Sequence, residues 1–487
     1  MAQIITIAIG IIIPRLVLVN LGSESNGLLN SISSILTYMS LLEAGVGITS
    51  LQALYKPIAD NDKNSINGIM SATHQYYKKT GFIYLAIVIA LSVGYPLLVK
   101  TSISKVYVFL VVLLAGLSGV MSYFFQGKYR ILLQAEGKNY IITNITTITS
   151  VCISVSKAAA IVAGGNVVVI QSVYFAFNLV SLIFICSYVR VKYKWLDLKT
   201  EPNFKALGQR RAVLIHQITE LIFNNTDVII LTAFTSLKTV SVYSMYAMIF
   251  GMVKAVAVTF SDSFSYSVGQ SYSNKEKFDR IFNTYEVYNM SITFACFCIA
   301  AVLMFPFLTL YTKGVNDINY IDPIVLVLFV LFYLLQNGRK SSQTVINIAQ
   351  HFEQTKWRSA AEAAINLFSS IIFTYFFGIY GVLLGTIVAL LYRTNDVILY
   401  ASKLLKRSPL ITYKRWITNF VLFVLICYLT SKINVNLGNY INLFIYGVVL
   451  SCTVIPIFVI VNSVLEPKTA KYAFSTLKNM VLNKLHK

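Results

Sequence analysis

Ionisable side chains lie on polar faces of segments that are otherwise apolar enough to cross a membrane. In residues 27–54, Glu43 shares one helical face with Ser40 and other small polar side chains at spacings of three and four. In residues 240–265, Lys254 lies on a similar stripe of serine and glycine. A charged side chain in the middle of the hydrocarbon layer costs about 3 kcal/mol, so it needs water or a partner. A carboxylate in that position can hold a proton or a small cation, and an ammonium group can attract an anion.

A third set of polar side chains follows one face of residues 214–237 at spacings of four, four and three, and consists of His216, Glu220, Asn224 and Asp227. Two carboxylates and an imidazole on one face can hold a proton or a small cation. We interpret His216 as solvated because it lies near the end of the segment, whereas Asp227 lies deeper. Arg15, in residues 2–21, falls at nearly the depth of Asp227. An Arg15–Asp227 ion pair would either take part in binding or have a purely structural role.

The polar faces have two interpretations. Small residues alone would favour tight helix–helix packing, whereas Glu43 and Lys254 favour the wall of a water-filled cavity, which is the interpretation we adopt. Lys157 lies in the outer third of residues 141–163, where its ammonium can reach the membrane surface. We therefore rank it below Arg15 and Lys254 as a site residue. We expect an anionic substrate to contact Arg15, Lys254, Lys157 and Ser40. The candidates for ion coupling, to H⁺ or Na⁺, are Glu43, Glu220 and Asp227.

The elements that position these residues are membrane spans. The chain has 487 residues, of which 56% are hydrophobic and 12% charged, about half the charged fraction of a soluble domain. The sequence therefore predicts an all-α integral membrane protein. Fourteen apolar runs are long enough to span: 2–21, 27–54, 81–100, 105–126, 141–163, 167–189, 214–237, 240–265, 287–311, 321–338, 358–378, 379–399, 416–432 and 441–464.

The basic residues alternate between the two sides of these spans. Of the 40 lysine and arginine residues, about 30 lie in or beside alternate connections, about five lie in the other connections, and Arg15, Lys157 and Lys254 lie within spans. By the positive-inside rule both termini and the basic connections are cytosolic. The net charge of +21 is then a signal of topology and of attraction to anionic lipid, and we expect no nucleic-acid partner.

The spans are predicted to form two pseudo-symmetric halves. The polar faces of 27–54 and 240–265 align at an offset of 214 residues, which equals six helices and is typical of an internally repeated transporter. We expect an N-terminal six-helix lobe over 1–195 and a C-terminal six-helix lobe over 207–402. An extra helix pair over 414–464 and an amphipathic cytosolic tail over 465–487 follow.

The sequence offers little for catalysis or for cofactors. The six cysteines all lie within apolar runs, so neither a disulfide framework nor a metal site is indicated. A glycine-rich phosphate-binding loop ending in Lys-Ser/Thr is absent from the sequence. We expect no cofactor, no ATP hydrolysis and no enzymatic activity.

Three stretches resemble one family. LGSESNGLLNSISSILTYMSLLEAGVGITSLQALYKPIADNDKNSINGIM (21–70) resembles the N-terminal block of Wzx-type polysaccharide flippases, members of the MOP (multidrug/oligosaccharidyl-lipid/polysaccharide) exporter superfamily that includes the MATE transporters. FNNTDVIILTAFTSLKTVSVYSMY (223–246) resembles the seventh-to-eighth helix block, and GIYGVLLGTIVALLYR (378–393) is similar to the twelfth helix. The first block is the more specific, and the resemblance extends over nearly the whole chain.

The resemblance implies a fold, a substrate and partners. It implies two six-helix lobes around a cavity that opens alternately to each side of the bacterial inner (cytoplasmic) membrane. The substrate would be an undecaprenyl-pyrophosphate-linked oligosaccharide, flipped from the inner to the outer leaflet for O-antigen, lipopolysaccharide, capsule or another glycan. The partners would be that lipid and the glycan polymerase and glycosyltransferases of the same pathway. By similarity to lipid II flippases, helices 13 and 14 would help form a groove for the lipid tail.

Two other functions stay open. A MATE-like drug/cation antiporter shares the architecture, but it should prefer an anionic cavity, whereas Arg15 and Lys254 add positive charge. A membrane glycosyltransferase or polymerase is less expected, because the outer connections are about ten residues or shorter. For Glu43 we keep two roles, balancing Lys254 or binding the coupling ion.

Overall fold

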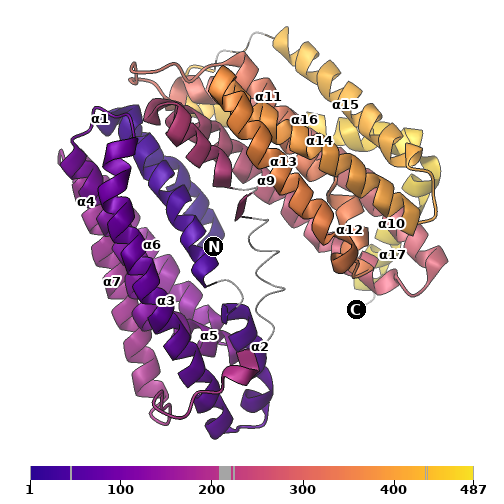
Figure 1. Cartoon of the computed structure of the whole chain (residues 1–487). Coiled ribbons are helices and arrows are strands. Elements are labelled where there is room, and N and C mark those ends of the chain that lie inside the picture. Colours follow the sequence, from indigo (N-terminus) through magenta and orange to yellow (C-terminus); the bar gives the residue numbers. More distant parts are fainter. Residues whose placement is uncertain are drawn as a thin grey trace. The chain divides into compact units, whose positions relative to one another are not determined.

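The computed structural model describes residues 2–43, 46–207, 221–222, 225–433, 435 and 437–485, and all of the regular structure within these residues is helical (Figure 1). The chain divides into two compact units. Unit 1 comprises Met1–Ser244 and Gly314–Ile318, and unit 2 comprises Met245–Lys313 and Asn319–Lys487.

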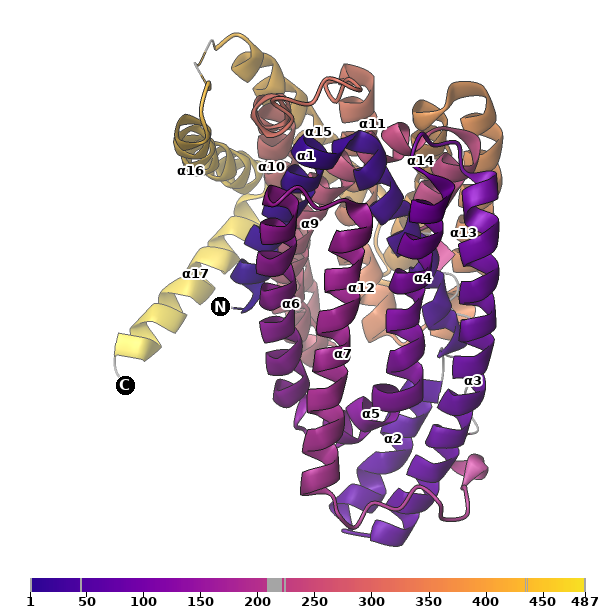
Figure 2. The same ribbon diagram turned by 90° about the vertical axis from the view of Figure 1, so that its left-hand side faces the viewer.

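Unit 1 is a bundle of long helices. Its described helices are α1 (Ala2–Tyr38), α2 (Val46–Ala59), α3 (Lys63–Leu98), α4 (Lys105–Met121), α5 (Gly127–Ala135), α6 (Asn139–Val162), α7 (Val167–Lys192) and a shorter helix at Asn225–Phe234. A 3₁₀ turn at Met39–Leu42 follows α1, and a π-helical turn at Ser122–Gln126 joins α4 to α5. A second view shows α3, α4, α6 and α7 running along one another (Figure 2).

Unit 2 contains most of α9 (Leu237–Ser271), followed by α10 (Lys275–Tyr311), α11 (Pro323–Gly338), α12 (Lys340–Ile348), α13 (Phe352–Phe377), α14 (Ile379–Leu404), α15 (Leu410–Ser431), α16 (Tyr440–Leu465) and α17 (Pro467–Leu485). Helices α13 and α14 touch through glycine. A Cβ at Gly381 would lie 2.0 Å from the carbonyl oxygen of Phe373, and one at Gly385 would lie 2.4 Å from the backbone nitrogen of Ser370. Only glycine allows this approach, as in other membrane helix pairs.

The chain is a multi-pass membrane protein. Eleven of the described helices are long and apolar enough to cross a membrane, or up to twelve when the pair Gly10–Leu42 and Val46–Ala59, bent by 47°, is one span. Fourteen spans were expected. Two causes account for the difference. The runs 2–21 and 27–54 both fall within α1 and α2, and only part of 214–237 is described, where the helix Asn225–Phe234 is too short to count as a span.

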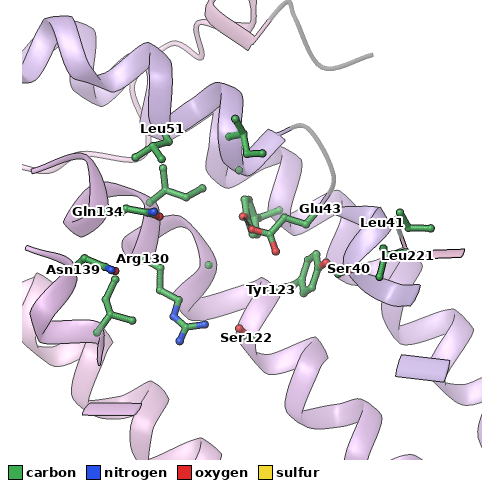
Figure 3. A pocket seen from close by; sticks show the side chains of 16 residues that line it. Ser40, Leu41, Glu43, Leu51, Ser122, Tyr123, Arg130, Gln134, Asn139 and Leu221 are labelled. Atoms are coloured by element: carbon green, nitrogen blue, oxygen red, sulfur yellow. Dashed lines mark hydrogen bonds between the residues drawn. The ribbon is translucent and has the colours of Figure 1, made fainter. Parts of the chain in front are cut away.

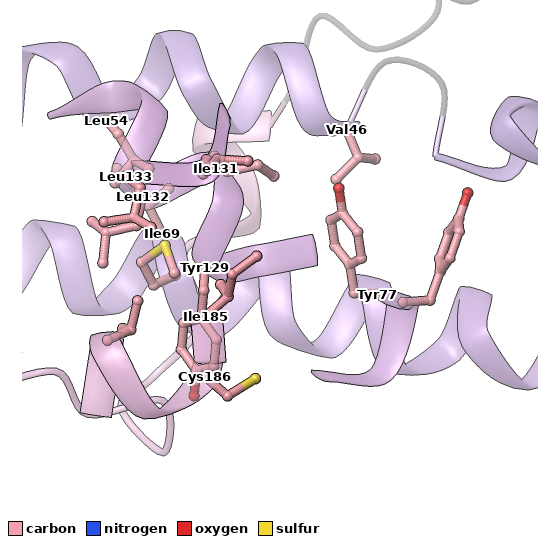
Figure 4. Close-up of a cluster of buried hydrophobic side chains, with 14 of the residues drawn as sticks. Val46, Leu54, Ile69, Tyr77, Tyr129, Ile131, Leu132, Leu133, Ile185 and Cys186 are labelled. Carbon is pink, nitrogen blue, oxygen red and sulfur yellow. The ribbon is translucent and has the colours of Figure 1, made fainter. Parts of the chain in front are cut away.

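The apolar core of unit 1 supports the elements that carry the candidate site. Buried side chains of α2, α3, α5 and α7 meet in one cluster, which includes Leu54, Ile69, Leu132 and Ile185 together with Tyr77 (Figure 4). Leu132 and Leu133 anchor one face of α5 in this cluster, so the opposite face of that helix is free to line a cavity.

Buried ion pairs hold the last helices of unit 2 to α10. Glu286 is fully buried and accepts hydrogen bonds from Arg407 at 2.5 Å and from Arg415. Arg415 also pairs with Glu466 at 2.6 Å. The sequence analysis counted these arginines only as topology signals. They also have a structural role, because each positive charge is compensated inside the helix bundle.

We expect Glu286→Gln to lower the free energy of unfolding by about 3–5 kcal/mol, because it leaves the buried guanidinium of Arg407 without its carboxylate and that of Arg415 with Glu466 alone. Thermal unfolding of the full chain in detergent micelles measures this loss. Glu276→Gln is the matched control, because Glu276 pairs with Arg280 on an exposed helix face and such pairs contribute little. Equal melting temperatures for the two variants would contradict the structural role of Glu286.

Candidate functional site

A cavity of about 700 Å³ lies within unit 1 and combines opposite charges with polar and apolar walls (Figure 3). It is formed by the end of α1 and its 3₁₀ turn, the start of α2, the middle of α3, the π-helical turn, α5 and the start of α6. Its lining residues are Ser40, Leu41, Glu43, Gly47, Ile48, Leu51, Tyr77, Ser122, Tyr123, Gly127, Arg130, Ile131, Gln134, Asn139, Ile142 and Leu221.

Glu43 is held on one wall of this cavity. Its carboxylate accepts a hydrogen bond from the Tyr77 hydroxyl, and Tyr77 is itself only 2% exposed and packs against Tyr123 at 5.6 Å between ring centroids. A Cβ at Gly47 would lie 3.0 Å from Glu43 Oε1. The glycine therefore leaves room for the carboxylate beside the start of α2.

Arg130 lies on the opposite wall. Its side chain extends from α5 into the space that Glu43 faces (Figure 3). Its Nε is buried and has no hydrogen-bond partner among the described residues. A guanidinium that lines a cavity can bind an anion in the bidentate manner that suits carboxylate and phosphate. Gln134 and Asn139 lie on the same side and add amide groups that can bind hydroxyls.

Arg130 was not among the predicted site residues, because the spacing of the apolar runs places 127–140 in a cytosolic connection. In the structure, residues Gly127–Ala135 form α5, which continues α4 through the π-helical turn and belongs to the same candidate span, Lys105–Ala135. The signal for this continuation is present in the sequence. Tyr129, Leu132 and Leu133 follow one helical face, and Arg130 and Gln134 follow another at a spacing of four. π-Helical turns within helices are frequent at functional sites.

The structure brings two of the predicted site residues together, because Ser40 and Glu43 both line the cavity. Asp227 is elsewhere in unit 1; it is 4% exposed, and its Oδ2 accepts a hydrogen bond from the Tyr243 hydroxyl at 2.8 Å. Lys157 lies on α6, and its Nζ is 4.9 Å from the centroid of the Tyr174 ring, a cation–π contact.

The remaining predicted residues are placed as follows. Arg15 is a half-buried residue of α1 in unit 1, whereas Lys254 is a half-buried residue of α9 in unit 2. His216, Glu220 and Asn224 lie outside the described residues. The Arg15–Asp227 pair and the balance of Glu43 with Lys254 stay predictions.

The polar face that carries Glu43 is open over the second half of α1. Ser33, Thr37 and Ser40 are exposed, and the hydroxyl of Thr37 donates back to the Ser33 carbonyl at 2.8 Å. Tight packing would bury these residues. Their exposure therefore argues against a packing seam along this part of α1.

A short turn fixes the hairpin of α5 and α6 that carries Arg130 and Asn139. Lys138 Nζ donates to Glu136 Oε2 at 2.6 Å and to the Tyr193 hydroxyl at 3.0 Å, and Tyr193 donates to the same carboxylate. The hydrogen bond that Lys138 donates to Glu136 raises the pKa of the lysine. Burial raises the pKa of Tyr193 to about 12, so both groups keep their protons at neutral pH.

Comparison with solved structures identifies the fold. The chain is similar to the lipid II flippase MurJ in its inward closed conformation, with a TM-score of 0.73 and 14% identity over 96% of this chain and 98% of that chain. It is also similar to a multidrug resistance MATE family transporter of the MOP superfamily in its inward-facing conformation, with a TM-score of 0.61 and 15% identity over 83% and 95% of the two chains.

A third similar structure is a ligand complex of the MATE multidrug transporter DinF-BH, with a TM-score of 0.59 and 12% identity over 82% of this chain and 92% of that chain. No protein-family model and no curated protein matches the sequence. The chain therefore has the fold that MurJ and these MATE transporters share.

Proposed function

We propose that this protein is a flippase that moves an undecaprenyl-pyrophosphate-linked oligosaccharide from the inner to the outer leaflet by alternating access. The observation that carries the proposal is Arg130, whose guanidinium side chain lines a cavity together with polar groups. The similarity to MurJ extends over 96% of the chain and supports a lipid-linked substrate. Wzx-type flippases are the group whose sequence blocks the chain resembles.

The charges of the cavity suit such a substrate. A pyrophosphate carries about two negative charges and presents oxygens that a guanidinium binds in pairs. Gln134, Asn139 and Ser122 can exchange hydrogen bonds with sugar hydroxyls. When the cell interior is negative, outward movement of each negative charge releases about 2.3 kcal/mol per 100 mV. The membrane potential can therefore drive export.

The lipid tail requires an apolar surface. Unit 2 contains a second cavity of about 530 Å³ lined mostly by apolar side chains of α10, α11, α15 and the α15–α16 connection, among them Val302, Leu326, Phe420, Phe423 and Val424. Its chemistry suits a hydrocarbon chain. We assign it to the polyprenyl tail, in agreement with the groove that the resemblance implies for helices 13 and 14, which correspond to α15 and α16.

Ion coupling is assigned to Glu43. It is the carboxylate that lines the cavity in the described part of the chain, and the Tyr77 hydroxyl holds it in place. A proton or Na⁺ bound at Glu43 would change the net charge that the pyrophosphate meets. Glu220 and Asp227 remain further candidates, and Arg15, Lys157 and Lys254 remain candidates for contact with the substrate at other stages of transport.

We place the protein in the bacterial cytoplasmic membrane with both termini in the cytosol, as the distribution of basic residues predicts. The two six-helix lobes, the extra helix pair and the membrane-surface tail belong to the same proposal. Helix α17 occupies Pro467–Leu485, and Lys468 and Lys471 in its first turns would face anionic lipid headgroups.

The alternative function is a drug/cation antiporter, favoured by the similarity to MATE structures and by the carboxylate of Glu43. Liposomes that contain the purified protein distinguish the two. We expect a fluorescent undecaprenyl-pyrophosphoryl oligosaccharide in the inner leaflet to become accessible to an external quencher, and a cationic dye to stay inside. Dye extrusion without lipid exposure would contradict the flippase and favour the antiporter.

A further inference from the structure

Helix α1 is interrupted at Gly22, and the interruption creates a place for an anion. Gly22 adopts φ 80° and ψ 171°, a conformation that favours glycine. The helix restarts at Ser23, so the first N–H groups of the second half lack partners within the helix. Their partial positive charge attracts a negative group.

The carboxylate of Asp317 occupies this place. Ser23 donates its backbone N–H to Asp317 Oδ2 at 3.0 Å and its hydroxyl to Asp317 Oδ1 at 2.6 Å. Ser23 is fully buried, whereas Asp317 is an exposed residue of the connection between α10 and α11. Both carboxylate oxygens are therefore bound by one residue of α1.

The segment that carries Asp317 is unusual in its packing. Gly314–Ile318 groups with unit 1, whereas the chain on either side of it, up to Lys313 and from Asn319 onward, groups with unit 2. The Ser23–Asp317 contact is thus made by a segment that is joined to α10 at one end and to α11 at the other.

The residues next to Ser23 make comparable contacts that involve only the continuous part of unit 1. Glu24 Oε2 accepts hydrogen bonds from Ser102 N at 3.0 Å and from the Ser102 and Thr101 hydroxyls, at 2.5 and 3.1 Å. Asn26 donates to the Ser241 hydroxyl at 2.7 Å. The positive-inside pattern predicts that residues 22–26, 101–104 and 312–320 are all outer connections, and these contacts show that the three meet at one end of unit 1.

We propose that the Ser23–Asp317 contact is a latch that keeps the outer side of the transporter closed and that must break in every transport cycle. The inference rests on the proposed function only in assuming alternating access. Two hydrogen bonds to a charged carboxylate stabilise the closed state. Removal of the carboxylate would lower the ratio of closed to open protein roughly tenfold or more. The Glu24 contacts do not release, because both of their sides belong to one unbroken part of unit 1.

Cross-linking tests whether the latch must open. In liposomes, the double variant Ser23→Cys, Asp317→Cys is oxidised with copper–phenanthroline, which accepts the two electrons as the two thiols lose their protons and join. We expect a disulfide, loss of lipid exposure, and recovery on reduction. The matched control, Glu24→Cys with Ser102→Cys, should cross-link and keep transport. Absence of a cross-link at 23–317, unimpaired transport in the cross-linked form, or equal loss in the control would each overturn the latch.

A second measurement needs no substrate and separates the latch from the proposed function. Ser40→Cys provides a thiol in the cavity, and a membrane-impermeant maleimide added from outside measures outward opening against the same chain with Ser40 intact. We expect Asp317→Asn to increase labelling of this thiol roughly tenfold and Glu24→Gln to leave it unchanged. If Asp317→Asn also leaves labelling unchanged, the latch is wrong even where lipid exposure occurs. If labelling rises in a protein that exposes no lipid, the latch stands and the flippase does not.

Discussion

Arg130→Gln should raise the lipid concentration needed for half-maximal transport roughly 30- to 150-fold, because a charge-assisted contact with pyrophosphate is worth about 2–3 kcal/mol. Glutamine keeps much of the length and polarity of the side chain, so the apolar face of α5 at Leu132 and Leu133 stays packed. The measurement is the initial rate of lipid exposure in liposomes across a range of lipid concentrations.

Arg280→Gln is the matched control for Arg130→Gln, since Arg280 is an exposed arginine that pairs only with Glu276 in the described structure. It should transport like the unchanged protein. Arg130→Lys should recover part of the lost affinity, because lysine restores the charge without the planar pair of donors. If Arg130→Gln and Arg280→Gln had equal half-saturating concentrations, Arg130 would not contact the headgroup.

Glu43→Gln should abolish the dependence of transport on an imposed pH or sodium gradient while leaving transport driven by the membrane potential. The amide keeps a hydrogen-bond acceptor for the Tyr77 hydroxyl but cannot take up a proton or hold Na⁺ by charge. The measurement compares initial rates of lipid exposure under each gradient, applied separately. Asp262→Asn is the control, because Asp262 is an exposed carboxylate of α9 that pairs with Lys340 at 3.4 Å.

Two results would contradict the role of Glu43. Unchanged gradient dependence in Glu43→Gln would exclude Glu43 as the coupling carboxylate and would leave Asp227 and Glu220 as the candidates. Loss of gradient dependence in both Glu43→Gln and Asp262→Asn would indicate a general effect of lowering the negative charge of the protein.

The sequence was sufficient for the membrane class and for one wall of the cavity. Glu43 and Ser40 could be predicted because their spacing of three places them on one face, and because a carboxylate within an apolar run needs a hydrated environment. The all-α membrane class could be predicted because long apolar runs in lipid can only be helices or barrels, whereas the fold shared with MurJ and the MATE structures was expected from the resemblance of three stretches.

The opposite wall was not predicted because the sequence around Arg130 has two interpretations, a basic cytosolic connection or an amphipathic helix. The positive-inside rule explains a basic residue near a cytosolic connection. The spacing of Leu132 and Leu133 indicates the helix instead, and their burial in the structure decides in favour of it. Arg407 and Arg415 also fit the positive-inside rule in the sequence, but in the structure they form ion pairs with the buried Glu286. Long-range partners of this kind, more than 120 residues apart in the chain, leave no local pattern.

The central claim is that the cavity of unit 1 recognises an anionic lipid headgroup through Arg130. The most direct test gives the unchanged protein three fluorescent polyprenyl oligosaccharides in liposomes, joined through pyrophosphate, through monophosphate or through an uncharged linker. We predict that the half-saturating concentration rises from the first to the third and that Arg130→Gln removes most of this difference. Equal transport of the uncharged and the pyrophosphate lipid by the unchanged protein would contradict the claim.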